Sequence, residues 1–352
     1  MTSRTHPAQQ PDGQAERPDD TAPHSPASLT RAQWRYVLAR SVKEFRRDRC
    51  LDQSTALAFR SALVTFPTML VLVSLLGMLG ETSRVMRFTV DMIASLGSDD
   101  TANSVRALFK ELAKAPAGYA FALGVVLLLW SASGYVTAFG RAMNSIYGVS
   151  EGRTAWKLRV AFVPLGALLV FLLLLAAGAL LLGGEMLSGL ELSDAAVLAW
   201  NIVRVPLALG LATTVIALLY YFSPNIKHPR LRWMSVGAAG ALAVWALASL
   251  GLVLYFANFS SFDRSYGAIG GALVFLLWLW LSNFALVLGG EFDAELERMR
   301  QLRGGRAAEA HIFVPLRATS ALSIAQNEEL HDEIAARAIR DEARRGQAEQ
   351  AD

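Results

Sequence analysis

Six long stretches without a charged residue constrain what this chain can fold into. No Asp, Glu, Lys or Arg occurs in residues 61–80, 115–140, 160–184, 205–226, 233–262 and 265–290. About 20 apolar residues in a helix cross a hydrocarbon layer of ~30 Å, and no stretch alternates apolar and polar residues as a barrel strand does. Because lipid offers backbone groups no partners, a spanning segment must be helical. The stretches therefore predict membrane helices rather than buried helices of a large soluble protein.

The predicted fold is an all-α polytopic membrane protein, with six transmembrane helices and short amphipathic helices at the interface. The spans are expected at 56–80, 117–140, 160–184, 196–222, 233–257 and 267–290. Composition agrees, because 53% of the 352 residues are hydrophobic and 18% are charged, against about a quarter charged in soluble domains. The single cysteine, Cys50, excludes an intrachain disulfide framework and a cysteine-rich metal site.

Basic residues between the spans set the expected orientation. Seven lie between positions 31 and 49, four between 141 and 159, and three between 227 and 232, whereas 185–194 has none. Loops rich in Lys and Arg stay in the cytoplasm, so both termini are expected there. The loop 81–116 carries five basic residues and is still expected outside, because six alternating spans require it.

Three segments flank the transmembrane domain, which is expected to cover 56–296. Residues 1–29 are rich in proline and lack an apolar run, which predicts a disordered tail. Residues 30–55 predict a basic amphipathic helix on the membrane surface, and 297–352 predict a charged cytoplasmic tail. The apolar side of the surface helix is expected to hold Trp34, Val37, Leu38, Val42 and Phe45. Anionic lipid headgroups are the favoured partner of this helix; the alternative, a nucleic acid, is not expected.

No residue pattern predicts catalysis or a bound cofactor. The five histidines lie outside the expected spans, and phosphate-binding and nucleophile motifs are absent from the sequence. Carboxylates cluster where the sixth span ends, at Glu291, Asp293, Glu295 and Glu297. Glu291 and Glu295 share a helix face and could hold a divalent metal, but a solvated helix end is the favoured interpretation. We therefore expect no enzyme, no metal site and no cofactor.

Polar residues inside a span are costly and therefore mark candidate functional positions. Arg204 and Asn201 share a face of the fourth predicted span, and Pro206 frees a carbonyl group beside them. We expect the Arg204 guanidinium to face the bundle, toward backbone carbonyls or the hydroxyls of Tyr255 or Tyr266. Arg204, Asn201, Tyr255 and Tyr266 together form a candidate intramembrane polar site. The alternative is a guanidinium that extends outward to the headgroups.

Two further arginines lie closer to the ends of their spans. Arg60 is near the start of the first predicted span, and Arg141 is near the end of the second. Both positions are shallow enough for a long side chain to reach the headgroup region while its stem stays in the hydrocarbon. We expect both guanidinium groups to extend in that way.

Several short motifs occur in a fixed order along the chain. They are Phe66-Pro67, Asn144-Ser-Ile-Tyr147, Tyr220-Tyr-Phe-Ser-Pro224, Tyr266-Gly267, Trp278-Leu-Trp280-Leu-Ser282 and Gly289-Gly-Glu291. Over about residues 35–300 the chain thereby resembles the YihY/BrkB family of bacterial inner-membrane proteins, although Arg60 stands where a tyrosine is typical. The positions that carry the resemblance are Pro67, Asn144, Tyr147, Pro224, Gly267, Trp280, Gly289 and Glu291.

The resemblance implies six membrane helices, a multi-pass location in the bacterial inner membrane and no settled activity. Members of the family have carried the labels ribonuclease BN and serum-resistance virulence factor, and the family has been linked to lipid export in the cell envelope. The ribonuclease label finds no support in the residues, since no metal-binding set of carboxylates or histidines stands on a soluble domain.

Polar groups and prolines within the spans favour a protein that transports or flips a lipid or another amphiphile in the cell envelope. The alternative is a non-catalytic scaffold for envelope proteins, and a membrane-anchored ribonuclease or hydrolase is the least supported hypothesis. Expected partners are membrane lipids, with envelope proteins as partners of a scaffold. Gly267 and Gly271 form a GxxxG pair, which suits a homo-oligomer as well as packing within one chain.

Overall fold

The structure, a computed structural model, describes residues 28–78, 103, 106–107, 111, 116–181, 193–227, 231–258, 261–322, 330–337 and 340. Within these residues the regular structure is helical, and an isolated bridge between Ile226 and Leu316 is the sole β interaction. Six helices are long and apolar enough to cross a membrane. The prediction of an all-α polytopic membrane protein is confirmed. The expected tail 1–29 and loop 81–116 lie almost entirely outside the described residues.

The long helices begin and end close to the apolar stretches. They are α2 (Cys50–Met78), α5 (Ala117–Ile146), α7 (Val163–Leu181), α9 (Asp194–Phe222), α10 (Leu231–Asn258) and α11 (Ser261–Arg303). A short helix, α6 (Ala155–Ala161), precedes α7. Pro164 lies in the first turn of α7, where a missing N–H costs no hydrogen bond. Pro67 and Pro206 instead lie inside α2 and α9.

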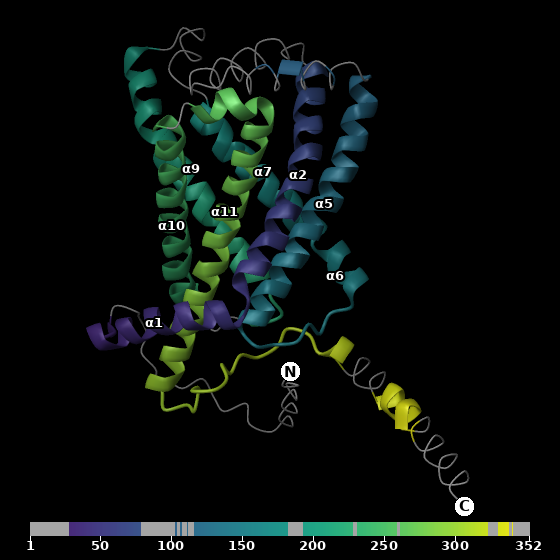
Figure 1. The fold of residues 1–352 in the computed structure, drawn as a ribbon, viewed down its shortest axis with the longest axis vertical. Coiled ribbons are helices and arrows are strands. Elements are labelled where there is room, and N and C mark those ends of the chain that lie inside the picture. Colours follow the sequence, from purple (N-terminus) through teal and green to yellow (C-terminus); the bar gives the residue numbers. More distant parts are fainter. Residues whose placement is uncertain are drawn as a thin grey trace, which may run out of the picture.

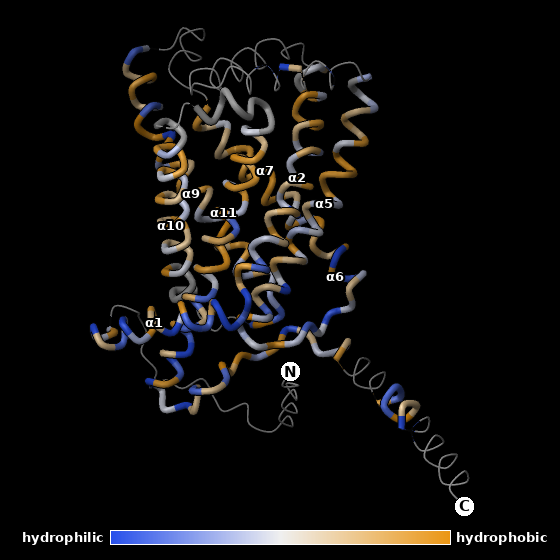
Figure 2. The backbone as a smooth tube through the Cα atoms, in the orientation of Figure 1, coloured by the Kyte–Doolittle hydropathy of each residue, from blue (hydrophilic) through white to orange (hydrophobic). Residues whose placement is uncertain are grey.

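The six long helices pack as a closed ring. Each of α2, α5, α7, α9 and α10 contacts the next long helix along the chain, and α11 returns to contact α2 (Figure 1). α5 also reaches across to α9, where the rings of Phe139 and Tyr220 stack with centroids 5.9 Å apart. The hydropathy of the backbone follows this arrangement, with apolar helix walls and a hydrophilic end (Figure 2).

We call that hydrophilic end the base; it is the end at which α1 (Arg31–Arg47) lies and α11 finishes (Figure 1). Thr30 caps α1, because its hydroxyl accepts the Gln33 N–H while the Gln33 side chain accepts the Thr30 N–H. The helix packs on α11, where Trp34 stacks on Phe292 with centroids 6.1 Å apart. α1 therefore lies across the end of the bundle, and its place on a membrane surface stays a prediction.

The apolar residues of α1 are divided between two surfaces, where one surface was expected. Val37 and Phe45 are buried in the bundle, whereas Leu38 and Val42 are exposed. Position 38 follows 37 by about 100° around a helix, so one apolar stripe is wide enough to face the bundle on one side and to stay exposed on the other. The helix ends before 55: Arg49 adopts a positive φ of 52° and the chain turns directly into α2.

α11 continues well beyond 290, and the segment after it folds back on the base. The chain reverses at Gly305, whose φ of 78° favours glycine. Residues 304–318, which we call the strap, then run extended beneath the bundle (Figure 1). Lys227 donates its backbone N–H to Pro315 at 2.8 Å, and Arg317 donates its own to Asn225 at 3.1 Å. The first part of the expected tail 297–352 is therefore part of the folded domain.

Candidate functional site

A network of buried polar groups joins α5, α9 and the intervening loops at the base. Asn225 donates its backbone N–H to Oδ1 of Asn144 at 2.7 Å, and the Asn144 amide donates to Glu151 at 2.9 Å. Glu151 pairs with Arg153 at 2.7 Å, and Arg153 also donates to the Ser223 carbonyl at 2.8 Å. Asn144, Ser223 and Asn225 are buried. The network thereby fixes the end of α5 against the end of α9.

The carboxylate cluster of α11 is buried as well. Glu291, Asp293 and Glu295 are 1%, 4% and 2% exposed, respectively. The expectation of a solvated helix end is wrong, because α11 continues for three more turns and is covered by α1 and α10. The local sequence does not reveal this burial, because the cover is supplied by α1 and α10, which come from other parts of the chain.

Two of the carboxylates are neutralised by arginines. Glu295 pairs with Arg298 at 2.9 Å and with Arg40 of α1 at 3.1 Å. Glu297 pairs with Arg300 at 2.5 Å. Buried ion pairs of this kind compensate the loss of hydration only when both partners are present, so these groups serve the packing of α1 and α11.

Glu291 and Asp293 differ, since neither has a cationic partner among the residues described. The Cys50 thiol donates to Glu291 at 3.8 Å, and the Gly237 N–H donates to Oδ1 of Asp293 at 2.8 Å, while Oδ2 of Asp293 is buried and bonds to nothing. A metal shared by Glu291 and Glu295 would have to displace the arginines around Glu295. Within the described ranges, no three His, Cys, Asp or Glu side chains gather in a metal-binding arrangement.

Tyr147 lies beside these carboxylates at the end of α5. Its side chain is buried, and burial, followed by the negative charges of Asp293, Glu297 and Glu291, raises the pKa of its hydroxyl well above the ordinary value. The phenol is therefore neutral and remains a hydrogen-bond donor next to the acidic groups.

Asn283 continues the line of polar side chains along α11 into the span. Its Oδ1 accepts the Tyr135 hydroxyl at 2.9 Å, and its amide donates to the Ser61 hydroxyl at 3.0 Å, so α2, α5 and α11 meet there. Between this level and the base, the Tyr220 hydroxyl donates to the Leu286 carbonyl at 2.5 Å. We call the three buried residues of this line the α11 polar row: Asn283, Glu291 and Asp293.

The intramembrane site expected around Arg204 stays a prediction. Arg204 and Asn201 are half-buried on α9, and the Asn201 amide oxygen is buried without a hydrogen-bond partner. In the described part of the chain no hydrogen bond joins Arg204 to Tyr255, whose side chain is exposed on α10. The side chain of Tyr266 lies outside the description. The structure thus places Arg204 and Asn201 on the same helix, and a contact of Arg204 with Tyr266 stays a prediction.

The motif positions divide between the base and the spans. Those at the base are Asn144, Tyr147, Pro224, Gly289 and Glu291. Trp280 lies higher on α11, and its indole N–H donates to the Thr55 hydroxyl at 3.1 Å. Pro67 lies inside α2, and Gly267 lies in α11 within a stretch whose surroundings are not described.

Sequence reasoning did not single out three residues that hold this region together. Asn225 directly follows the Ser-Pro pair, and this position after a helix-ending proline was an available signal. Arg298 follows Glu295 at the i, i+3 spacing that predicts a helical ion pair. Tyr135 gave no signal, because its partner Asn283 is 148 residues away.

Comparison with known proteins places the chain among membrane proteins. The family described as virulence factor BrkB matches residues 41–312. The ribonuclease-like protein YfkH of Bacillus subtilis (strain 168) is 32% identical over 194 residues, or 53% of this chain and 68% of that protein. The UPF0761 membrane protein VSAL_I2938 of Aliivibrio salmonicida (strain LFI1238) is 25% identical over 280 residues, 76% of this chain and 84% of the relative.

A second UPF0761 membrane protein, from Alkalilimnicola ehrlichii (strain ATCC BAA-1101 / DSM 17681 / MLHE-1), is 25% identical over 272 residues. That match covers 72% of this chain but 57% of the relative, so the chain spans little more than half the length of that protein. No solved structure is significantly similar to the chain.

Proposed function

The chain belongs to the BrkB virulence-factor family of membrane proteins, and from this premise we propose that it moves a lipid or another amphiphile between the leaflets of the bacterial inner membrane. Both termini lie in the cytoplasm in this proposal, since the basic residues of α1 and of the loops at the base belong on that side. The proposed transport requires no covalent chemistry and no cofactor, so in this proposal the protein is not an enzyme.

The α11 polar row is the observation that carries the proposal. Asn283, Glu291 and Asp293 are buried side chains of α11 that span about 15 Å along the helix at ~1.5 Å per residue. Asn283 lies within the span, whereas Glu291 and Asp293 lie toward the base, Glu291 against Cys50 of α2 and Asp293 against Gly237 of α10. Polar side chains at such positions are costly, and in membrane proteins they mark the paths of ions and polar substrate groups. A lipid headgroup that crosses the bilayer needs polar groups of this kind.

Two members of the row are suited to exchange protons during transport. Glu291 faces the negative charges of Asp48, Glu295 and Glu44 and the Cys50 thiol. Burial and the negative charges of these three neighbours favour the neutral carboxyl form of Glu291, whereas the Cys50 thiol, which donates to the carboxylate, favours the ionised form.

Asp293 faces the Gly237 N–H and the rings of Tyr147 and Tyr220. No cation among the described residues lies beside Asp293. Its carboxyl group is therefore expected to ionise only when the packing around it changes. We propose that protonation of these two carboxyl groups drives the transport step, in place of a nucleotide.

Asp293→Asn tests this proposal, because it keeps the shape of the side chain and removes the proton that it can release. In proteoliposomes that contain fluorescent phosphatidylglycerol, transfer between leaflets is followed by chemical quenching from outside. We expect the variant to transfer lipid about tenfold more slowly, a change that ~1.4 kcal/mol in the barrier produces. The response of the rate to a pH gradient should also disappear.

Asp52→Asn is the matched control, since Asp52 is an exposed acid on α2 and its replacement should leave the rate unchanged. Equal rates for the native protein and Asp293→Asn would contradict proton coupling. If lipid transfer with the native protein is no faster than in empty liposomes, transport is contradicted, and a non-catalytic scaffold is the remaining candidate.

The described helix 330–337 favours this second candidate function. Leu330 and Ile334 are exposed one turn apart on it, as a binding surface for an envelope protein requires.

The proposed orientation can be measured with cysteine labelling. The native Cys50 is the one cysteine of the chain and is buried, so it provides a silent background. On intact cells, a membrane-impermeant maleimide should label Ser193→Cys, at the end of α9 remote from the base, and should not label Lys227→Cys at the base. The reverse pattern would place the termini outside.

A further inference from the structure

Two arginines from different helices meet beside Gly134 of α5, and a third lies two turns along α5. A Cβ atom on Gly134 would lie 3.2 Å from Nη2 of Arg159 and 3.5 Å from Nη1 of Arg60, so both guanidinium groups lie against the same point of α5. Arg60 of α2 also donates to the Gly134 carbonyl at 3.4 Å. The positive charges of Arg141, two turns along α5, and of Arg159 both act on Arg60. We call Arg60, Arg141 and Arg159 the arginine cluster.

The arginine cluster has no acidic partner among the described residues. None of the ion pairs found in these residues includes any of the three arginines. Nε of Arg159 is buried and donates to nothing. Three mutually repelling cations with unused donors are stable together only when an anion or water compensates them. Unused guanidinium donors from neighbouring helices at one place are suited to bind an anion.

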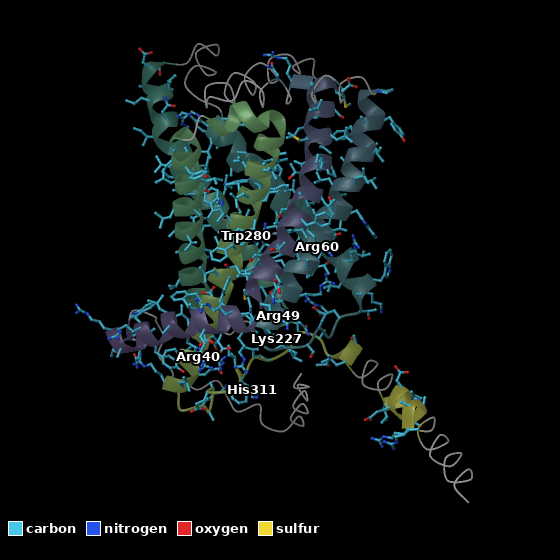
Figure 3. The ribbon with its side chains drawn as sticks, viewed as in Figure 1. Arg40, Arg49, Arg60, Lys227, Trp280 and His311 are labelled. Carbon is cyan, nitrogen blue, oxygen red and sulfur yellow. The ribbon has the colours of Figure 1, made fainter. Side chains whose placement is uncertain are left out.

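The surroundings of the cluster are apolar and face outward. The Arg159 guanidinium lies 3.8 Å above the ring of Trp130, a cation–π contact that holds it in place. Trp130 is exposed, and so are Trp156, three residues before Arg159 on α6, and Leu63, three residues after Arg60 on α2. Figure 3 places Arg60 well above the base, at which Arg40, Arg49 and Lys227 lie. The snorkelling expected of Arg60 is thus replaced by a contact with α5 inside the apolar wall.

We propose that the arginine cluster binds the phosphate group of an anionic phospholipid. Guanidinium groups match phosphate oxygens with pairs of parallel N–H donors, and those of Arg60 and Arg159, which lie against the same point of α5, can share one phosphate. The exposed rings of Trp130 and Trp156 and the side chain of Leu63 are placed to contact the acyl chains. As the substrate class of the transport step, this assignment rests on the proposed function. The binding itself can be measured without any transport.

The same chemistry would hold a free phosphate ion, so the test compares both sources. Native mass spectrometry of the purified full chain in detergent measures retention of phosphatidylglycerol, of diacylglycerol and of inorganic phosphate. We expect phosphatidylglycerol to bind about tenfold more tightly than diacylglycerol, and millimolar phosphate not to displace it. The double variant Arg60→Gln/Arg159→Gln should lose this preference, a change of about tenfold in Kd.

Lys157→Gln is the matched control, because Lys157 is an exposed cation on the same short helix as Arg159 and lies outside the cluster. Arg60→Lys/Arg159→Lys keeps the charge, and we expect it to retain part of the preference. Equal binding of phosphatidylglycerol by the glutamine double variant and the native chain would overturn the site. Inorganic phosphate that binds in a cluster-dependent way and displaces the lipid would overturn the lipid assignment.

A second measurement uses the native chain and does not depend on the folding of the double variant. Phosphatidylglycerol brominated on its acyl chains should quench the fluorescence of Trp130. The contribution of Trp130 is obtained by subtracting the fluorescence of Trp130→Phe from that of the native protein. Brominated diacylglycerol should quench it less. Equal quenching by the two lipids would contradict the proposal. If lipid binds at the cluster and Asp293→Asn transfers lipid at the native rate, proton-driven transport fails while the binding site stands.

Discussion

Gly289→Ala is expected to lower the free energy of unfolding by about 3 kcal/mol, the upper range for a side chain forced into a packed core. An alanine Cβ there would stand 2.5 Å from the Tyr220 hydroxyl and 2.6 Å from the Ala241 Cβ. It would also stand 2.8 Å from the backbone oxygen of Gly237, which has no rotamer to change. α9, α10 and α11 meet at this point, so the substitution separates three helices at once.

Thermal unfolding in detergent, followed by the loss of a monodisperse peak on size exclusion, measures the effect. Gly240→Ala provides the matched control on α10, because a Cβ at Gly240 would meet nothing within 4 Å. That variant should unfold at the native temperature or slightly above it, since alanine favours a helix over glycine. If the two variants unfold at the same temperature, the close approach of α10 and α11 at Gly289 is incorrect.

Asn225→Ala is expected to release the strap from the base. The Asn225 amide donates to the carbonyl of Ala318 at 2.8 Å and of Ser150 at 3.2 Å, and it accepts the Ala318 N–H at 3.0 Å. Each of these buried bonds contributes ~1 kcal/mol, so their loss should cost about 2–3 kcal/mol locally. Hydrogen exchange should rise in residues 304–318, and limited proteolysis should cut there first.

The comparison for this variant is Asn103→Ala, in which an exposed amide loses one bond to Arg106 and the strap should keep its native protection. Unchanged exchange of the strap in Asn225→Ala would show that other contacts hold it. The half-buried guanidinium of Arg317 is the main one, because it donates to the carbonyls of Ile226 and Tyr221. Burial lowers the pKa of Arg317, yet the group remains charged at any physiological pH.

The spans could be predicted from the sequence because their signal is local. A stretch of about 20 apolar residues without a charge predicts a membrane helix from its composition alone, independently of the rest of the chain. The ends of the helices depend on more than composition. α2 begins at Cys50 because Arg49 takes a positive φ. An arginine does not predict this conformation, whereas a glycine or asparagine at the position would have done so.

The candidate site was less accessible to sequence reasoning, for a physical reason. A run of Glu and Asp resembles a solvated helix end until its partner is known, and Arg40 lies about 250 residues before Glu295. Asn283 was visible as a polar residue within an apolar span, but its contact with Tyr135 joins two helices that are distant in sequence. The arginine cluster likewise combines residues from α2, α5 and α6, which no periodicity within one helix relates.

The closure of the ring has a consequence for the order in which the protein is made. α1 and α2 leave the ribosome first, yet both pack against α11, the last long helix to be synthesised. Until α11 has been inserted, Val37 lacks its α11 neighbours Leu296 and Met299, Phe45 lacks Phe284, and the strap that follows α11 has not yet been made. Assembly of the base is thereby postponed to the end of translation, and a chain that ends before α11 cannot complete the base.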